Sequence, residues 1–409
     1  VAIGGLGDDS ISVGSGNNIA LGDEGRVTFQ RGSGVRDRIR SEYLDGDGLS
    51  VLDASGAVVG NDDITAGAGS DVIIGGLGSG RLTGGTGNNI VLGDEGFVQY
   101  QNQFRTFGES VLHEVSSLYL DNPVTRATVT TLQGGTETIT TGAGDDIIIA
   151  GLGSDVIHAS DGNNIVLGDE GGITHQTRTG LRDRITSRYL NWTTFAVLDA
   201  THAQVGNDRI SAGTGNDVVI GGLGTETITV SDGDNIVFGD EGFVQYQHQS
   251  YTANTSVLGE VSSLFLELAD RFVQGGNESI TVGLGADIVI AGLGDDAIDA
   301  SDGDNIVFGD EGTITYQLST GLRDRIQSRY LDGSGDSPIH AIEAVVGNDV
   351  ITTGIGNDVA IGGLGSETID VSDGANIVIG DEGEIKYQHR SAALRQIATH
   401  FTDGAGRFV

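Results

Sequence analysis

Short apolar runs recur along the chain with a spacing of nine residues. Residues 141–149 read TGAGDDIII, 150–158 AGLGSDVIH and 159–167 ASDGNNIVL. In each nonapeptide a glycine-rich turn leads through a polar sixth residue into three β-prone residues, of which the eighth is Ile, Val, Leu or, twice, Ala. A three-residue strand cannot bury an apolar side chain alone, but stacked copies form a sheet. The pattern therefore predicts an all-β solenoid of very short parallel strands.

The nonapeptides gather in blocks of four, and insertions of 34–39 residues separate the blocks. The tetrapeptide Gly-Asp-Glu-Gly follows each block, beginning at Gly22, Gly93, Gly168, Gly239, Gly309 and Gly380, or about every 71 residues. The expected blocks are 1–21 (partial), 57–92, 132–167, 203–238, 273–308 and 344–379. Two kinds of insertion alternate, type A at 22–56, 168–202 and 309–343, and type B at 93–131, 239–272 and 380–409 (partial).

The insertions carry a mixed secondary-structure signal. Each opens on an alternating run such as Phe97-Val98-Gln99-Tyr100, which is typical of a strand. The central segments place residues such as Leu181 and Ile185 at helical spacing, yet they are rich in β-branched residues. We expect β-hairpins, with short helices as the alternative.

The two sheets of the solenoid differ in the residues that flank the inward eighth position. In nonapeptides one and three these are largely polar, as at Thr140, Ser211, Thr229 and Thr281. In nonapeptides two and four they are apolar, as at Ile149, Leu167, Ile220, Phe238, Ile290 and Phe308. A sheet that is apolar on both faces needs cover on both. We expect the insertions to pack on this one face, through residues such as Val257, Leu264, Leu181 and Tyr189, with a second copy of the chain where they fall short.

Composition narrows the choice of partners. Among 409 residues there are 69 Gly, two Pro and no Cys, and the glycines are spread evenly, which excludes collagen, disulfide staples and zinc–thiolate sites. The net charge of −37 arises from 58 acidic and 21 basic side chains. Such a charge opposes binding to nucleic acid and to anionic membranes, and it favours hard divalent cations. No stretch of 18 apolar residues is present, so we expect no membrane insertion.

The nonapeptide resembles the G-G-x-G-x-D-x-U-x repeat of the repeats-in-toxin (RTX) family, the hemolysin-type calcium-binding proteins, in which U is a large apolar residue. The resemblance covers a little over half of the chain. It implies a right-handed parallel β-roll in which two nonapeptides make one turn. It also implies that multiple Ca²⁺ ions lie between turns stacked 18 residues apart, bound through the sixth residues.

The sixth residues are therefore the candidate metal ligands. They are Asp62, Glu137, Asp208, Glu278 and Asp349 in nonapeptide one, Asp71, Asp146, Asp217, Asp287 and Asp358 in two, Asp9, Asp155, Glu226, Asp296 and Glu367 in three, and Asn89, Asn164, Asn235, Asn305 and Asn376 in four. Asparagine brings no charge, glutamate is longer than the family's aspartate, and Gly80 supplies no ligand. Gly-Asp-Glu-Gly is either a further calcium site or only a charged turn.

No catalytic motif occurs: there is no His-Glu-x-x-His, no Gly-x-Ser-x-Gly and no cysteine nucleophile. Val1-Ala2-Ile3 matches the tail of a nonapeptide, so we expect a segment of a giant secreted or surface protein. We expect a non-enzymatic structural or adhesive role as a stalk, sheath, filament or adhesin, which would self-associate or bind a surface or glycan. The alternative is the calcium-binding accessory region of an enzyme or toxin. Either fits an extracellular protein of bacterial type I secretion.

Overall fold

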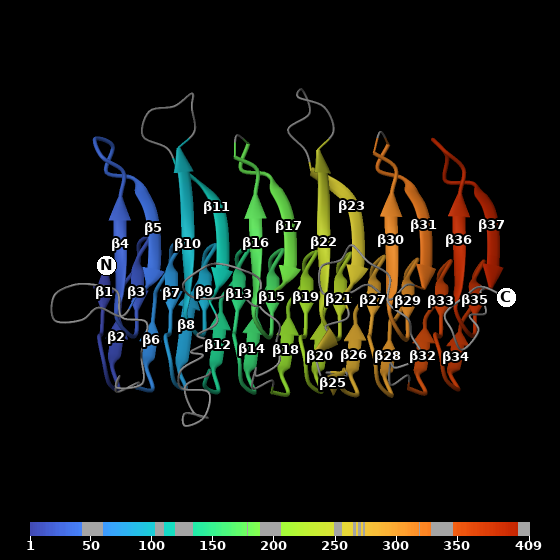
Figure 1. Cartoon of the computed structure of the whole chain (residues 1–409), viewed down its shortest axis with the longest axis horizontal. Coiled ribbons are helices and arrows are strands. Elements are labelled where there is room, and N and C mark those ends of the chain that lie inside the picture. Colours follow the sequence, from blue (N-terminus) through green and yellow to red (C-terminus); the bar gives the residue numbers. More distant parts are fainter. Residues whose placement is uncertain are drawn as a thin grey trace. The chain divides into compact units, whose positions relative to one another are not determined.

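The computed structural model describes residues 1–42, 60–102, 110–118, 134–177, 179–188, 206–248, 256–264, 267–268, 271–272, 275–318, 320–328 and 347–399. These residues form strands and turns without a helix, so none of them forms a helix that could cross a membrane. The chain divides into an N-terminal unit, Val1–Leu198 with His202–Arg209, and a C-terminal unit, Ile210–Val409 with Asp199–Thr201. Each unit holds the same three kinds of sheet (Figure 1).

The first kind, which we call the covered sheet, is parallel and consists of the strands of nonapeptides two and four. In the N-terminal unit its order is β1 (Ala2–Ile3), β3 (Ile19–Leu21), β7 (Val72–Ile74), β9 (Ile90–Leu92), β13 (Ile147–Ile149) and β15 (Ile165–Leu167). In the C-terminal unit the order is β19 (Val218–Ile220), β21 (Ile236–Phe238), β27 (Ile288–Ile290), β29 (Ile306–Phe308), β33 (Val359–Ile361) and β35 (Ile377–Ile379).

The second kind, the open sheet, is also parallel and consists of the strands of nonapeptides one and three. Its N-terminal members are β2 (Ser10–Ser12), β6 (Asp63–Thr65), β8 (Arg81–Gly85), β12 (Thr138–Thr141) and β14 (Val156–Ala159). The remaining members are β18 (Arg209–Ala212), β20 (Thr227–Val230), β26 (Ser279–Val282), β28 (Ala297–Asp299), β32 (Val350–Thr353) and β34 (Thr368–Val371).

The third kind, the hairpin sheet, is antiparallel and is built by the insertions. Its N-terminal strands are β4 (Gly25–Phe29), β5 (Arg36–Ser41), β10 (Gly96–Asn102), β11 (Ser110–Ser117), β16 (Gly171–His175) and β17 (Arg182–Ser187). Its C-terminal strands are β22 (Gly242–His248), β23 (Ser256–Ser263), β30 (Gly312–Tyr316), β31 (Arg323–Ser328), β36 (Gly383–Tyr387) and β37 (Leu394–Thr399). A separate two-stranded ribbon joins β24 (Glu267–Leu268) to β25 (Arg271–Phe272). The predicted hairpins are confirmed, and the alternative of helices is wrong for the described residues.

The parallel register follows the nonapeptide period. Ile147 of β13 pairs with Ile165 of β15, 18 residues later, so two nonapeptides complete one turn of the roll. On its other side Ile147 pairs with Ile90 of β9, although a whole insertion lies between them in the sequence. The roll therefore continues in register across each insertion within a unit, and the strands stack as the sequence predicts.

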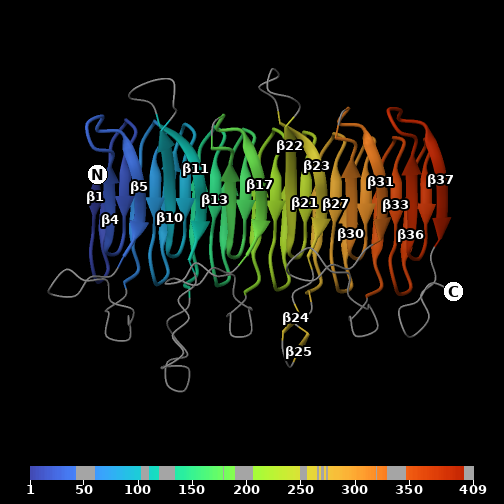
Figure 2. The ribbon, with the colours of Figure 1, turned by 45° about the horizontal axis from the view of Figure 1, so that its top comes forward.

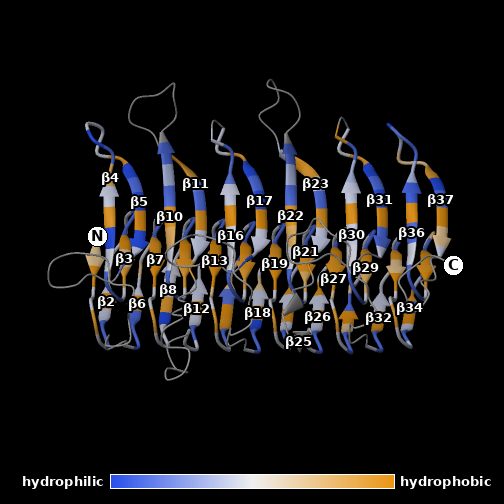
Figure 3. Ribbon diagram, in the orientation of Figure 1, coloured by the Kyte–Doolittle hydropathy of each residue, from blue (hydrophilic) through white to orange (hydrophobic). Residues whose placement is uncertain are grey.

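Burial separates the two parallel sheets as expected. In the covered sheet Ile149, Leu167, Ile220, Phe238, Ile290 and Phe308 are each 1% exposed. In the open sheet Thr140, Thr229 and Thr281 are exposed and Ser211 is half-buried, while the inward residues between them are buried. Figure 3 shows the same contrast in hydropathy. The prediction of one covered and one solvated sheet is confirmed.

The hairpin sheet contacts the covered sheet at the first glycine of each hairpin. A Cβ on Gly96, Gly242 or Gly312 would overlap the side chain of Leu92, Phe238 or Phe308, respectively. The turned view of Figure 2 shows the hairpin strands in front of the covered strands. Glycine is required here because two sheets approach within the space of one side chain.

A row of β-branched residues runs across the hairpin sheet two residues beyond these glycines. In the C-terminal unit it pairs Val244 with Val261, Val261 with Ile314, and Ile326 with Ile385, and all five are fully buried. Side chains two residues apart share a face of a strand, so this row lies on the same face as the glycines. Of the covering residues expected from the sequence, Leu264 is buried against Phe243. Val257 and Leu181 lie near hairpin tips and are only half-buried, and Tyr189 is outside the described residues.

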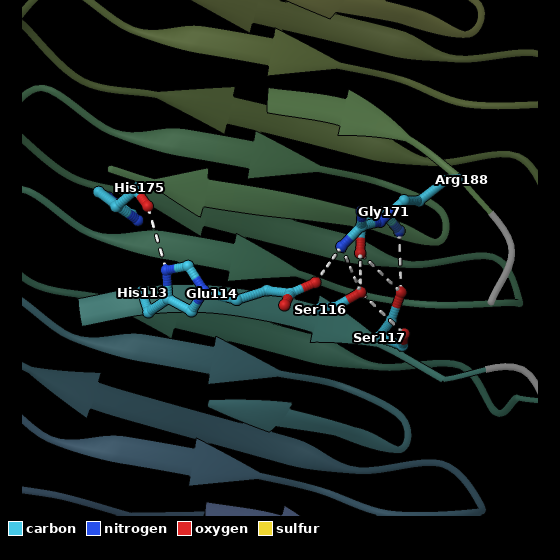
Figure 4. A network of polar contacts seen from close by, with 7 residues as sticks. All are labelled: His113, Glu114, Ser116, Ser117, Gly171, His175 and Arg188. Carbon is cyan, nitrogen blue, oxygen red and sulfur yellow. Dashed lines mark hydrogen bonds and ion pairs between the residues drawn. The ribbon is translucent and has the colours of Figure 1, made fainter. Parts of the chain in front are cut away.

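Neighbouring hairpins are joined to one another by polar contacts as well as by strand pairing. The Ser117 hydroxyl accepts the Gly171 N–H at 2.8 Å, and Ser41, Ser263 and Ser328 make the equivalent contact with Gly96, Gly312 and Gly383. Arg188 of the second type A insertion adds an ion pair to Glu114 of the first type B insertion at 2.7 Å (Figure 4). The hairpins of each unit therefore form one continuous layer.

Truncation of a covered side chain should destabilise the fold strongly. We expect Phe308→Ala to cost about 3–5 kcal/mol, because it leaves a cavity between the covered sheet and Gly312. The matched change Thr281→Ala in the open sheet should alter stability by no more than about 0.5 kcal/mol. Urea unfolding in saturating calcium, followed by circular dichroism, measures both. Equal effects of the two substitutions would contradict the division into covered and open sheets.

Candidate calcium sites

The turns that lead into the covered sheet, which we call the covered row, stack their sixth residues in a ladder. The Asp71 backbone N–H donates to Asn89 Oδ1 at 3.1 Å, the Asn89 N–H donates to Asp146 Oδ1 at 2.7 Å, and the Asp146 N–H donates to Asn164 Oδ1 at 3.1 Å. The C-terminal unit repeats the ladder through Asp217, Asn235, Asp287, Asn305, Asp358 and Asn376 at 2.8–3.0 Å. Aspartate and asparagine thus alternate strictly along this row.

The aspartates of the covered row keep one carboxylate oxygen for another ligand. Oδ1 of Asp71, Asp146 and Asp287 accepts a backbone N–H, whereas Oδ2 is buried and accepts no hydrogen bond from any described residue. Burial, the largest cause, raises the pKa of Asp146 and Asp287 to about 6. A buried carboxylate oxygen without a partner is costly, and a divalent cation satisfies both its charge and its lone pairs. Asp358 differs, because its Oδ2 accepts the Thr353 hydroxyl at 2.8 Å.

The asparagines of the covered row use both ends of their amides. Nδ2 of Asn89 donates to the carbonyl oxygens of Gly85 and Gly87 at 3.1 and 2.8 Å. Asn164, Asn235, Asn305 and Asn376 also donate to carbonyls of their own turns. The amide Nδ2 thus provides hydrogen-bond donors to carbonyl oxygens of its own turn. The metal-ligand role of these asparagines remains a prediction.

The fourth residue of each nonapeptide in this row must be glycine. Gly144 and Gly285 have φ of 148° and 154°, a conformation that residues with a Cβ rarely adopt. A Cβ on either would also overlap the carbonyl oxygen of the glycine one turn before it, Gly87 or Gly233. The tight stacking that brings the sixth residues into a ladder depends on these glycines.

The turns that lead into the open sheet, the open row, hold the other predicted ligands. After each type A insertion an aspartate accepts the backbone N–H of the aspartate that precedes the insertion: Asp62 from Asp9 at 2.8 Å, Asp208 from Asp155 at 2.8 Å, and Asp349 from Asp296 at 3.0 Å. Asp9 and Glu367, near the two ends of the chain, are half-buried, and the other acidic residues of the row are buried. Burial raises the pKa of Asp62, Asp155 and Asp296 to about 6, of Asp349 to about 7 and of Asp208 to about 8.

Glutamates replace aspartates in the open row beside type B insertions, and they behave differently. Glu137 and Glu278 donate their backbone N–H to Asp155 and Asp296 at 2.7 and 2.8 Å. None of their four carboxylate oxygens accepts a hydrogen bond from a described donor. Burial, followed by neighbouring acidic groups, raises the pKa of both side chains far above its usual value. These side chains lie against the Gly-Asp-Glu-Gly turns, because a Cβ on Gly93 or Gly239 would come within 3.0 Å of Cγ of Glu137 or Glu278, respectively.

The aspartate of Gly-Asp-Glu-Gly, which the sequence left as either a further calcium ligand or part of a charged turn, is buried in every copy but the last. Oδ2 of Asp23, Asp94, Asp240 and Asp310 accepts the backbone N–H of Leu77, Leu152, Leu293 and Leu364, respectively, at 2.5–2.9 Å. Oδ1 of Asp94 and Asp240 is buried and has no hydrogen-bond partner among the described residues. Burial raises the pKa of both side chains well above its usual value. The sixfold recurrence of the tetrapeptide is the signal in the sequence that points to these aspartates, and their role as calcium ligands remains a prediction.

The RTX calcium-binding nonapeptide repeat matches residues 1–28, 59–91, 74–96, 133–172, 202–237, 220–242, 274–313, 344–378 and 361–384, which together make up more than half of the chain. The chain belongs to this family. It is therefore a calcium-binding RTX β-roll with multiple calcium sites, and its buried carboxylates have the chemistry that such ions require. A search of curated proteins finds no match to the chain.

We expect Asp146→Asn to remove one calcium site from this RTX roll. The amide keeps an oxygen to accept the Asn89 N–H but loses the charge that binds the ion. The control is Asp145→Asn, because Asp145 is exposed and accepts the Asn163 N–H from the solvent side. Calorimetric calcium titration should show about one ion fewer for the first variant and no change for the second. Equal stoichiometry in both would exclude Asp146 as a ligand.

Acid should stabilise the calcium-free fold. The pKa values of about 6–8 in the fold exceed the value of about 4 that aspartate has in an unfolded chain. Raised pKa values give stability that is complete below pH 4 and is lost as pH rises through 6 to 8. Protein stripped of calcium on a chelating resin should resist urea better at pH 5.5 than at pH 8. Greater calcium-free stability at pH 8 would contradict the burial of charged carboxylates.

Proposed function

We propose that the chain is a calcium-dependent structural or adhesive segment of an extracellular protein, serving as a stalk, sheath, filament or adhesin. The observation that supports this most is the continuity of the modules. Within each unit the hairpins pair edge to edge, as β5 does with β10 and β23 with β30. The same insertions contact the covered sheet of the roll. Each module is thus joined to the next through two layers, which suits a load-bearing repeat.

Two arguments support an extracellular location. RTX repeats are typical of proteins that bacteria export by type I secretion. The buried carboxylates also make folding depend on calcium, and extracellular sites bind this ion with dissociation constants of about 10⁻⁴–10⁻³ M. Such sites are filled outside cells and empty at cytosolic calcium, so the chain would fold only after export. Self-association, or binding to a surface or glycan, fits the adhesive form of this role.

We also propose that the chain is not an enzyme. Two of the described histidines, His113 and His175, contact each other in the hairpin sheet through a hydrogen bond of 3.1 Å between His113 Nδ1 and the His175 carbonyl oxygen (Figure 4). Burial lowers the pKa of His175 to about 4, so the ring is neutral and serves as packing.

The second candidate function is the accessory region of a secreted enzyme or toxin, which the calcium-dependent roll alone would equally suit.

Immunogold electron microscopy of the producing cells distinguishes the two functions. A structural segment should label a layer or fibre at the cell surface, and EGTA should release the label, because the fold needs calcium at about 10⁻⁴–10⁻³ M. The control is treatment with the same concentration of EGTA that has already been saturated with calcium. Label found only in the culture fluid, in fractions with hydrolytic or lytic activity, would instead support the accessory region.

A further inference from the structure

Three acidic side chains meet where the chain leaves the roll and returns to it around the type B insertion of the C-terminal unit. Glu226 precedes the insertion in the open row, Asp240 lies in the Gly-Asp-Glu-Gly turn that begins it, and Glu278 follows it. One carboxylate oxygen from each lies within 4.8 Å of the other two, and all three side chains are buried. No other such trio of acidic, histidine or cysteine residues occurs in the described part of the chain.

Two members of this trio, Asp240 and Glu278, have buried carboxylate oxygens that accept no hydrogen bond from a described donor. Asp240 is 5% exposed; its Oδ2 accepts the Leu293 N–H, and its Oδ1 accepts nothing from the described residues. Glu278 is 2% exposed, and neither of its oxygens accepts a hydrogen bond from a described donor. Three carboxylates cannot remain buried, charged and this close without a counter-charge.

We propose that Glu226, Asp240 and Glu278 together bind one calcium-sized divalent cation, in a site separate from the single-carboxylate turns of the covered row. Oxygens bound to one Ca²⁺ at about 2.3–2.6 Å lie no more than about 5 Å apart, which the trio satisfies. A purely carboxylate donor set excludes the softer metals that prefer nitrogen or sulfur. Because its ligands stand on both sides of the insertion, the ion fastens the hairpin to the roll at its exit and return.

The N-terminal unit contains a natural variant of this site. At its type B insertion the corresponding residues are Gly80, Asp94 and Glu137, so one carboxylate is missing. Asp94 and Glu137 are buried and each interacts electrostatically with acidic neighbours, Glu137 with Asp94 itself. A Cβ on Gly80 would meet nothing closer than the Asp62 carbonyl oxygen at 3.4 Å, so a side chain can be introduced there without a clash at its Cβ. Gly80→Glu should therefore create a second three-carboxylate site.

Calcium stoichiometry of the full chain tests the proposal, measured by equilibrium dialysis with atomic absorption. Asp240→Asn and Glu278→Gln should each lose about one ion per chain, and Gly80→Glu should gain about one. The control Asp234→Asn, at an exposed residue that accepts the Ala286 N–H, should bind as many ions as the unaltered chain. Circular dichroism in calcium confirms that each variant compared is folded.

Folded Asp240→Asn and Glu278→Gln variants with the unaltered number of ions would overturn the site. Should those two variants fail to fold, Gly80→Glu still decides, since a folded variant without an added ion contradicts the three-carboxylate requirement. These results are independent of the proposed structural role. The structural role would be contradicted if the native protein were found only in the culture fluid, whatever the calcium stoichiometry of the variants.

Discussion

The fold depends on the neutralisation of carboxylates that it buries in stacked turns. Along the covered row each sixth residue lies one roll turn from the next, and its side-chain Oδ1 accepts a backbone N–H of the neighbouring turn, as Asp146 Oδ1 does from Asn89. The second oxygen is left in the interior. Because a buried, unpaired carboxylate disfavours folding, strands of only three residues cannot compensate for a whole row of them. Calcium supplies the missing charge, and because it binds the stacked turns of the folded roll it stabilises the sheets that those turns connect.

Two features of the chain reduce this electrostatic burden. In the covered row every second acid is replaced by asparagine, whose amide takes the carbonyls of its own turn, as Asn89 takes those of Gly85 and Gly87. The row therefore carries half the charge of an all-aspartate row while its ladder of hydrogen bonds stays complete. The hairpin sheet then buries residues such as Phe238 and Phe308, which adds apolar stabilisation of the kind that short strands lack. Calcium turns and covered apolar strands thus stabilise the same roll from its edge and from its face.

Much of this architecture is local and could be predicted from the sequence. The nine-residue period fixes strands such as Ile147–Ile149 in register, and the residues beside Ile148 reveal which sheet is covered. The sequence could not show which hairpin residues provide that cover, because Val257 and Leu181 are as apolar as Val261 and Ile185 but lie nearer the tips. Nor could it place Asp240 beside Glu278, since their proximity depends on where the chain returns after a long insertion. The amide contacts of the asparagines likewise depend on turn geometry that a repeat pattern does not specify.

Anomalous X-ray diffraction from crystals grown in calcium is the most direct test that ions neutralise the buried carboxylates. We expect calcium peaks about 2.3–2.6 Å from Oδ2 of Asp71, Asp146 and Asp287. The same map decides whether Asn89 and the other asparagines ligate an ion or only donate to their own carbonyls. A folded roll with no anomalous density beside these three aspartates, at calcium concentrations well above about 10⁻³ M, would show that calcium does not neutralise them.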